Sequence, residues 1–234
     1  MNKSWRKELS LWPPLAPDFK IDPQKTALMI IDMQYLDAHG DYGLGKIMKE
    51  QYSETGDYYL TRLSEAVVPN IQRLLRVFRE KGLRIIHITV GPELPDGKDF
   101  NPLRRVADTD IQGSTGKKSL YHKGTFEHSI LEELKPQPGE LVINKVTRGA
   151  FNSTGLDLRL RNMEIDGLVI AGVVTNACVN VTALDAADRG FKTILVDDAC
   201  GGLDQSSHDA VMKTFAGLFG KVWDTSEIIE YFSR

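Results

Sequence analysis

The chain has 234 residues, a net charge of −3, and 41% hydrophobic against 26% charged residues. This composition is typical of one globular domain, and without a run of five or six like charges it argues against a nucleic-acid or membrane-surface partner. No apolar stretch reaches the roughly 18–20 residues that cross a bilayer.

The N-terminal stretch and the cysteine content bear on the cellular compartment of the protein. The N-terminal stretch MNKSWRKELSLWPPLAPDF is charged and lacks the apolar core of a signal peptide. Only Cys178 and Cys200 are present, so no disulfide framework is possible. We expect a cytoplasmic protein with a single domain over residues 1–234, of which residues 1–23 form an N-terminal extension.

Short apolar runs rich in β-branched residues alternate with helical patterns along the chain. The runs predict strands at 26–32, 83–90, 140–145, 167–174 and 191–198, and a last short strand from 221. The intervening patterns predict helices at 58–82, 126–134, 155–163, 176–190 and 206–220, and a final one that ends near 232.

The strands are apolar throughout rather than alternating, which indicates burial on both faces by helices. We therefore expect a three-layer α/β/α fold of the α/β class, with an open, mainly parallel, six-stranded, doubly wound sheet. In such a sheet the chemistry lies at the carboxyl ends of the strands. The longest irregular segment, 91–125, is expected to be a lid or an oligomer contact.

Three reactive side chains come at predicted strand ends: Asp32, Lys145 and Cys178. Each has an ordinary explanation, as a turn residue, a solvated lysine or a small buried hydrophobe. Together they fit acyl transfer from an amide. A helix start and an ammonium group favour a reactive thiolate, and a carboxylate in reach takes the thiol proton and returns it to a leaving amine.

Three segments carry a more specific resemblance: IIDMQ (30–34), NKVTRGAFNSTGLDLRLRNM (144–163) and AGVVTNACVNVTALDAADRG (171–190). They resemble the signature segments of the isochorismatase-like cysteine hydrolases, in the same order and spacing. The resemblance spans about residues 24 to 225, and implies the isochorismatase-like hydrolase fold and an assembly as a homodimer or homotetramer.

The resemblance also implies a role for each member of the trio. Asp32 is expected to be the general acid and base, Lys145 the electrostatic partner that helps to hold the thiolate, and Cys178 the nucleophile. A cis peptide bond is expected between Val174 and Thr175, with Val174, Thr175 and Cys178 forming the oxyanion hole from main-chain N–H groups.

Departures from sub-family patterns narrow the chemistry. True isochorismatases cleave a vinyl ether and usually lack the cysteine, so Cys178 favours C–N hydrolysis. Nicotinamidases carry a metal-binding Asp-x-His, whereas segment 89–101 holds no histidine. His87, inside a strand, is expected to be a core histidine. We therefore expect no metal and no cofactor.

The segment around Arg148 resembles that of the ureido-amide hydrolases. Its guanidinium either binds a substrate carboxylate or ureido oxygen, or forms a salt bridge at a surface or interface. Phe151 and Asn152 are expected to line or support the pocket, with Tyr35 as its opposite wall. Gln34 is either structural or borders the pocket.

These observations predict an amidohydrolase that cleaves a C–N bond of a small amide or ureido substrate, such as a biuret-, triuret- or ureidoacrylate-like molecule, through a thioester on Cys178. An isochorismatase-type ether hydrolase, an N-carbamoyl amino acid amidase, and a catalytically silent interaction protein remain as alternatives. An enzyme predicts a hyper-reactive Cys178 whose reactivity drops in Asp32→Asn or Lys145→Ala. A silent protein predicts that Cys178 reacts no faster than Cys200.

Overall fold

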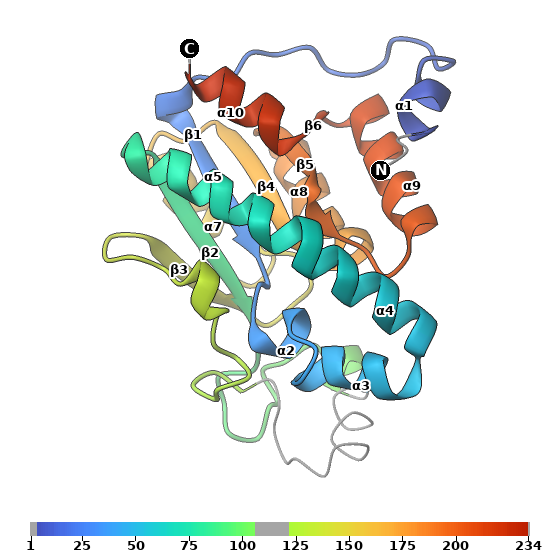
Figure 1. The fold of residues 1–234 in the computed structure, drawn as a ribbon. Helices are drawn as coiled ribbons and strands as arrows, with labels where there is room; N and C mark the ends of the chain where they lie inside the picture. The colour runs from blue at the N-terminus through green and yellow to red at the C-terminus, as the bar shows by residue number, and fades with distance from the viewer. Residues whose placement is uncertain (1–3, 106–121, 234) are drawn as a thin grey trace.

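A six-stranded parallel sheet forms the centre of the computed structural model, which describes residues 4–105 and 122–233 (Figure 1). Its strand order is β3-β2-β1-β4-β5-β6, and every neighbouring pair is parallel. The strands are β1 (Thr26–Ile31), β2 (Arg84–Val90), β3 (Leu141–Lys145), β4 (Gly167–Val173), β5 (Lys192–Gly201) and β6 (Lys221–Trp223). The expected α/β architecture and strand count are confirmed.

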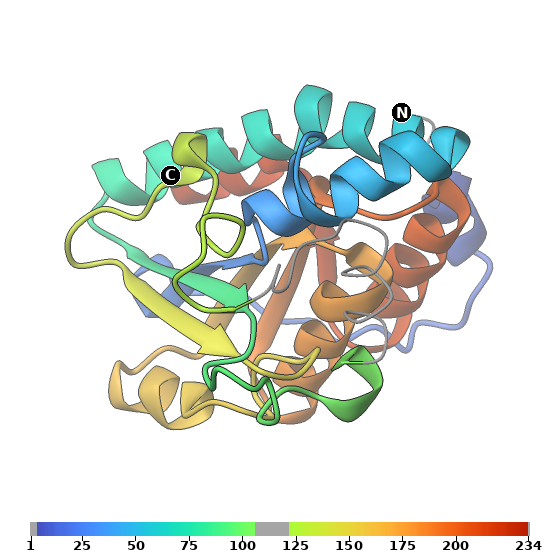
Figure 2. The same cartoon turned by 90° about the horizontal axis from the view of Figure 1, so that it is seen from below.

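The helices cover both faces of this sheet. They are α1 (Ser4–Leu9), η1 (Pro23–Lys25), α2 (Tyr35–Ala38), α3 (Gly43–Gln51), α4 (Ser53–Arg62), η2 (Leu63–Val67), α5 (Val68–Glu80), η3 (Glu132–Leu134), α7 (Leu156–Asn162), η4 (Thr175–Val179), α8 (Asn180–Asp188), α9 (Gln205–Leu218) and α10 (Thr225–Ser233). Seen from below, α5 and α10 lie on one side of the sheet and α7 and α8 on the other (Figure 2).

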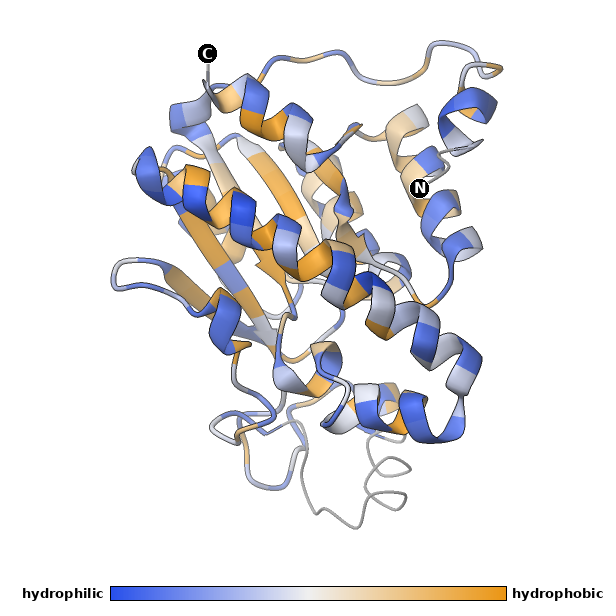
Figure 3. Cartoon of the chain, in the orientation of Figure 1, coloured by the Kyte–Doolittle hydropathy of each residue, from blue (hydrophilic) through white to orange (hydrophobic). Residues whose placement is uncertain are grey.

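Two apolar clusters fill the spaces between the layers, and β1 contributes to both. Leu28 and Ile30 pack toward α5 and α10, whereas Ala27, Met29 and Ile31 pack toward α7, α8 and α9. This division follows from the alternation of side chains along a strand. The hydropathy colouring shows the apolar strands inside and the polar helix faces outside (Figure 3).

The predicted helix at 58–82 begins earlier and has a defect in its middle. It starts at Ser53 with α4, passes through the π-helical segment η2, and continues as α5. Pro69 lies in the first turn of α5, directly after that segment. Proline lacks the N–H group that an uninterrupted α-helix needs at this point, which explains the change in hydrogen bonding.

The predicted helix at 126–134 is wrong apart from the short turn η3. Main-chain carbonyls of this segment accept hydrogen bonds from the start of α2: Tyr35 N lies 3.0 Å from Ser129 O, and Leu36 N lies 2.9 Å from Glu127 O. Gln34 and Ile130 form an isolated antiparallel bridge. The segment's polar backbone is therefore used to hold the loop after β1, which overrides its helical pattern.

Helix α1 of the N-terminal segment packs on the domain. Helix α1 contacts α9, and Trp5 is 3% exposed. Residues 106–121 of the expected lid or oligomer contact at 91–125 lie outside the described residues. Within residues 4–105 and 122–233, no helix is long and apolar enough to span a membrane.

Candidate active site

The strand order reverses between β1 and β4. These strands are neighbours in the sheet, although 135 residues that include β2 and β3 lie between them in the sequence. In doubly wound sheets this reversal opens a crevice at the carboxyl ends of the two strands. Asp32 directly follows β1, and η4 with Cys178 follows β4. The fold thus places both side chains beyond the carboxyl ends of two neighbouring strands, where such a crevice is expected.

Asp32 is held at the end of β1 in an unusual backbone conformation. Its φ is 51°, in the left-handed region that aspartate tolerates better than most residues. Its N–H donates to Ile88 O of β2 at 2.9 Å. The main chain therefore turns sharply at this residue while it stays tied to the sheet.

Lys145 reaches Asp32 from the edge strand β3. Its Nζ lies 2.9 Å from Asp32 Oδ2, and both side chains are buried. Nζ also donates to Thr147 O at 3.1 Å. A buried ion pair is stable only while both charges are present, because either charge alone carries an uncompensated desolvation cost.

Cys178 lies on η4 and is 5% exposed. Burial raises the pKa of its thiol to about 11, and the negative charge of Asp32 adds to this effect, whereas Lys145 and Arg104 oppose it. The expectation of a thiol ionised by the helix start and Lys145 therefore does not describe the resting site. Desolvation outweighs the favourable charges, and the thiol carries its proton at neutral pH.

Arg104 is a site residue that the sequence analysis missed. Its Nη1 lies 3.8 Å from Cys178 Sγ, and its guanidinium lies over the Phe100 ring, 5.2 Å from the centroid. The sequence offers two adjacent arginines, Arg104 and Arg105, in an irregular region, and no periodic pattern distinguishes them. Only the fold shows which one reaches the sulfur.

A buried polar network below η4 was also missed. The Thr175 hydroxyl lies 2.9 Å from His208 Nδ1, and His208 Nε2 lies 2.9 Å from Asp197 Oδ1. Asp197 Oδ2 accepts from the indole N–H of Trp5 at 3.2 Å, and Arg62 donates to Asp197 O at 2.9 Å. The network ties the first residue of the cysteine-bearing turn to β5, α9 and α1.

The cis peptide bond lies between Val173 and Val174, one residue before the expected Val174–Thr175 bond, so the predicted position is wrong. Val173 is the last residue of β4 and Val174 precedes η4. The chain thus changes direction at the strand end rather than inside the first turn. Val174 O then accepts from the N–H groups of Ala177 at 2.9 Å and Val179 at 3.3 Å.

Gln34, expected to be structural or to border the pocket, and Tyr35, expected as a pocket wall, have different surroundings. Gln34 is fully buried, and its amide is hydrogen-bonded to main-chain groups: Oε1 accepts from Val90 N at 2.8 Å, and Nε2 donates to His128 O at 2.7 Å. We assign it to holding the loop. Tyr35 lines a hollow of about 470 Å³ beside the ends of β2 and β3, against the Phe126 ring 4.5 Å away.

The remaining expected pocket residues separate in the fold. Phe151 is buried in the core, with its ring 5.9 Å from that of Phe191 and the Arg189 guanidinium 4.9 Å above it. Phe151 therefore contributes to the packing of the core. Asn152 is exposed, and so is Arg148, whose charge nonetheless acts on the buried carboxyl of Asp37.

His87 lies in the core, as the sequence predicted. It is 1% exposed and its Nε2 lies 3.0 Å from Glu140 Oε2, so it is a core histidine with a partner. Burial lowers its pKa. Among residues 4–105 and 122–233, no three histidine, cysteine or acidic side chains are grouped as metal ligands would be.

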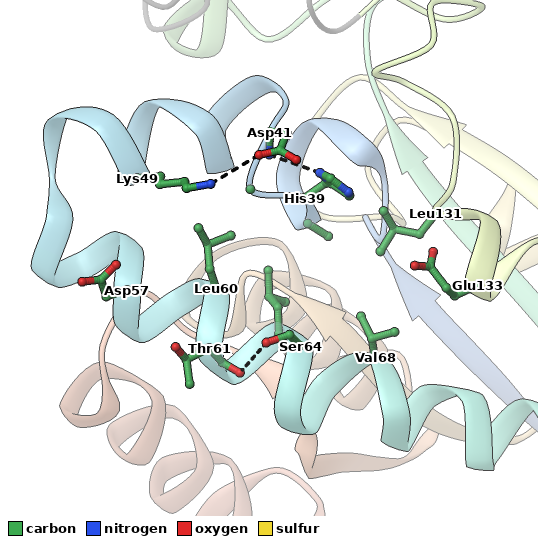
Figure 4. A pocket seen from close by; sticks show the side chains of 13 residues that line it. His39, Asp41, Lys49, Asp57, Leu60, Thr61, Ser64, Val68, Leu131 and Glu133 are labelled. Carbon is green, nitrogen blue, oxygen red and sulfur yellow. Dashed lines mark hydrogen bonds and ion pairs between the residues drawn. The ribbon is translucent and has the colours of Figure 1, made fainter.

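A second hollow, of about 580 Å³, lies between the loop after α2 and the helix α4–α5 (Figure 4). Its wall includes His39 and Asp41, and Asp41 forms an ion pair with Lys49 at 3.3 Å. None of Asp32, Lys145 and Cys178 lines it. It is therefore separate from the trio.

Comparisons with known proteins identify the family of the chain. The model of the Isochorismatase domain matches residues 26–227. The uncharacterized isochorismatase family protein YwoC of Bacillus subtilis is 31% identical over 210 residues, which cover 90% of this chain and 95% of that protein. The ureidoacrylate amidohydrolase RutB of Agrobacterium fabrum is 27% identical over 198 residues, 80% of each chain.

The fold also matches a solved structure. The cysteine hydrolase from Pseudomonas syringae pv. phaseolicola superposes with a TM-score of 0.76 at 24% identity, over 94% of this chain and 98% of that one. That likeness concerns the fold. With a family match across most of its length and the corresponding sheet, the chain belongs to the isochorismatase family of hydrolases.

Proposed function

We propose that the protein is a cysteine-dependent amidohydrolase that cleaves a C–N bond of a small amide or ureido substrate. The observation that supports this most is the meeting of Asp32, Lys145 and Cys178 at the strand reversal, with the acid ion-paired and the thiol buried. The RutB relative, named for amide hydrolysis, supports the same bond class.

The first chemical step forms a thioester. Because the resting thiol is protonated, Asp32 takes its proton as Sγ attacks the substrate carbonyl carbon. The carbonyl oxygen becomes an oxyanion, which main-chain N–H groups of Thr175 and Cys178 receive. The tetrahedral intermediate then collapses, its C–N bond breaks, and Asp32 returns the proton to the departing nitrogen.

The second step releases the acid. Water attacks the thioester carbon while Asp32 takes a proton from it, the C–S bond breaks, and the thiol regains a proton. Lys145 stays beside Asp32 throughout and holds the carboxylate in place. Arg104, 3.8 Å from the sulfur, favours negative charge at the reacting atoms.

The test is an ammonia-release screen over biuret, triuret, ureidoacrylate, N-carbamoyl amino acids and nicotinamide, with wild type, Cys178→Ala and Cys200→Ala. Cys200 is the matched control, since it is equally buried but lies in β5 away from the trio. We expect turnover of a ureido or amide compound that Cys178→Ala loses and Cys200→Ala keeps. Ammonia release retained by Cys178→Ala contradicts the proposal that this cysteine is the nucleophile.

A further inference from the structure

The buried hydrogen-bond network below η4 has no role in the mechanism above. Thr175, the first residue of η4, and His208 of α9 are fully buried, and Asp197 of β5 is 5% exposed. The Thr175 hydroxyl lies 2.9 Å from His208 Nδ1, and His208 Nε2 lies 2.9 Å from Asp197 Oδ1. The network therefore joins the turn that carries the cysteine to two further elements of the fold.

The neighbours of His208 determine which ring nitrogen carries the proton. Burial lowers the pKa of His208, so the ring is neutral at neutral pH and has a single N–H group. Its Nε2 lies 2.9 Å both from the Asp197 carboxylate, which accepts, and from Arg62 Nη2, which donates. Arg62 Nη2 also donates to the main-chain oxygen of Asp197 at 2.9 Å. We therefore assign the ring proton to Nε2, which leaves Nδ1 to accept from the Thr175 hydroxyl.

The main-chain N–H of Thr175 is a hydrogen-bond donor without an acceptor. Thr175 is the first residue of η4, so no carbonyl inside that helix can accept from it. Within residues 4–105 and 122–233, no carbonyl or side chain outside η4 accepts from it either. A buried N–H group without an acceptor is rare in proteins, and it is the kind of donor that an oxyanion requires. Thr175 thus has a side chain that is held and an N–H group that is available.

We propose that His208 is a positioning residue, which through the Thr175 hydroxyl holds the Thr175 N–H in the direction that stabilises the oxyanion of the reaction. This inference rests on the proposed function and adds a residue to it. The hydroxyl and the N–H belong to one residue, so a fixed side chain restricts rotation of the peptide group that carries the N–H. Asp197 in turn fixes the orientation and tautomer of the His208 ring, as a carboxylate does for histidines in other sites.

The test separates the hydroxyl group of Thr175 from the volume of its side chain. Thr175→Val keeps the shape and lacks the hydroxyl, whereas Thr175→Ser keeps the hydroxyl. With a substrate from the ammonia-release screen, we expect Thr175→Val to lower kcat roughly 10- to 100-fold and to change KM less than about threefold, because only the transition state carries the oxyanion. Thr175→Ser is expected to recover about tenfold of that loss.

Thr193→Val is the matched control for removal of a buried hydroxyl. Thr193 is also fully buried, and its hydroxyl donates to Phe191 O at 3.0 Å. It lies at the amino end of β5, at the opposite edge of the sheet from the trio. We expect Thr193→Val to lower the free energy of unfolding and to leave kcat within about twofold of wild type.

Two further readouts distinguish positioning from a general effect on the fold. Alkylation of Cys178 by iodoacetamide displaces iodide and forms no oxyanion, so we expect Thr175→Val to be labelled within about twofold of the wild-type rate. His208→Leu removes the same hydrogen bond from its other end. We therefore expect the double variant, Thr175→Val with His208→Leu, to lose at most about threefold more in kcat than the more impaired single variant. If His208→Leu does not fold, the Thr175 variants and the labelling rate still decide the question.

A wild-type kcat in Thr175→Val overturns the inference, as does a Thr175→Ser variant that is as impaired as Thr175→Val. Losses in kcat that multiply in the double variant, or a labelling rate that falls as far as kcat does, also overturn it. These outcomes are distinct from failure of the proposed function, which shows as ammonia release retained by Cys178→Ala. If Cys178 is essential and Thr175→Val turns over normally, the nucleophile stands and only the role of His208 falls.

Discussion

At the scale of single residues, the site is controlled by how three charges act on one buried thiol. Asp32 raises the pKa of Cys178, and Lys145 and Arg104 lower it, but burial has the largest effect. A protonated resting thiol protects the sulfur from adventitious oxidation and alkylation. The proton acceptor for activation is Asp32, whose own charge is balanced by Lys145.

This balance predicts how substitutions change the reactivity of the thiol. Asp32→Asn removes a negative charge that disfavours the thiolate, so we expect Cys178 to be alkylated faster at pH 8 while turnover is lost. Lys145→Met removes a positive charge and slows alkylation. In wild type the rate keeps rising up to at least pH 10, because the pKa is about 11.

Iodoacetamide labelling followed by peptide mass spectrometry measures these rates, with fully buried Cys200 as the internal reference. The expectation from sequence was the reverse for Asp32→Asn, a drop in reactivity. A wild-type plateau near pH 9, or slower labelling in Asp32→Asn, shows that burial and Asp32 do not control the thiol.

The Asp32–Lys145 ion pair predicts a non-additive effect on stability. Asp32→Asn or Lys145→Met alone leaves one charge buried without its partner, and we expect each to lower the free energy of unfolding by about 3–5 kcal/mol. The double variant removes both charges and is expected to be more stable than either single variant, although it has no activity. Urea denaturation of the four proteins measures the coupling, and additive losses contradict the ion-pair interpretation.

At the scale of elements, the turn between β4 and α8 is supported from below by the network of Thr175, His208 and Asp197. The network extends to α1, because the Trp5 indole donates to Asp197 at 3.2 Å. The N-terminal segment therefore contributes to the platform under the cysteine-bearing turn.

The contact of Trp5 gives a matched test within one segment. Trp5→Phe keeps an aromatic ring but removes the donor to a buried carboxylate, so we expect a loss of about 1–3 kcal/mol in the free energy of unfolding. Trp12→Phe serves as the control, since Trp12 is 37% exposed, and its effect is expected to be smaller. Thermal and urea unfolding compare the two, and equal effects contradict a special role for the Trp5–Asp197 hydrogen bond.

Some elements were predicted correctly because local hydrophobicity determines them. The 126–134 segment was predicted wrongly because contacts with a distant segment determine its structure. β1 and β4 are continuous apolar runs, and their burial patterns on both faces were readable from hydrophobicity alone. The 126–134 segment has a helix-like spacing of apolar residues, but its carbonyls accept hydrogen bonds from the loop after Met33. Contacts between segments 90 residues apart are invisible to a local pattern, and here they decide the structure.

The site residues likewise include some that the sequence predicted and others that it did not. Asp32, Lys145 and Cys178 were found because each stands at the end of a recognisable strand. Arg104 was missed because it comes from an irregular segment, where no periodicity fixes the direction of a side chain. Burial also reversed the expected effect on the thiol pKa, a quantity that the sequence does not contain.

At the scale of the whole molecule, buried titratable groups make stability depend on pH. Burial lowers the pKa of His87, His128 and His208 below the ordinary value. The unfolded chain then binds more protons than the folded one as pH falls through about 6.5. Asp37 acts in the opposite sense, because its pKa in the folded protein is about 6, above the ordinary value.

We therefore expect the free energy of unfolding to fall by about 1–3 kcal/mol between pH 7.5 and pH 5.5, since three histidines outweigh one carboxyl. In Asp37→Asn the opposing effect is gone, so the loss over the same range is larger. Urea titrations at the two pH values measure both slopes. Stability that is unchanged or higher at pH 5.5 contradicts this assignment of buried neutral histidines.

The central claim is that Cys178 is the nucleophile of a C–N hydrolase, and the most direct measurement is the mass of the enzyme during turnover. A substrate found in the ammonia-release screen is mixed with wild type and quenched in acid within the first turnovers. We predict an added acyl mass on the peptide that contains Cys178, discharged by hydroxylamine and absent from Cys178→Ala and from Cys200. Continued turnover with no acyl adduct on Cys178, or turnover by Cys178→Ala, contradicts the account.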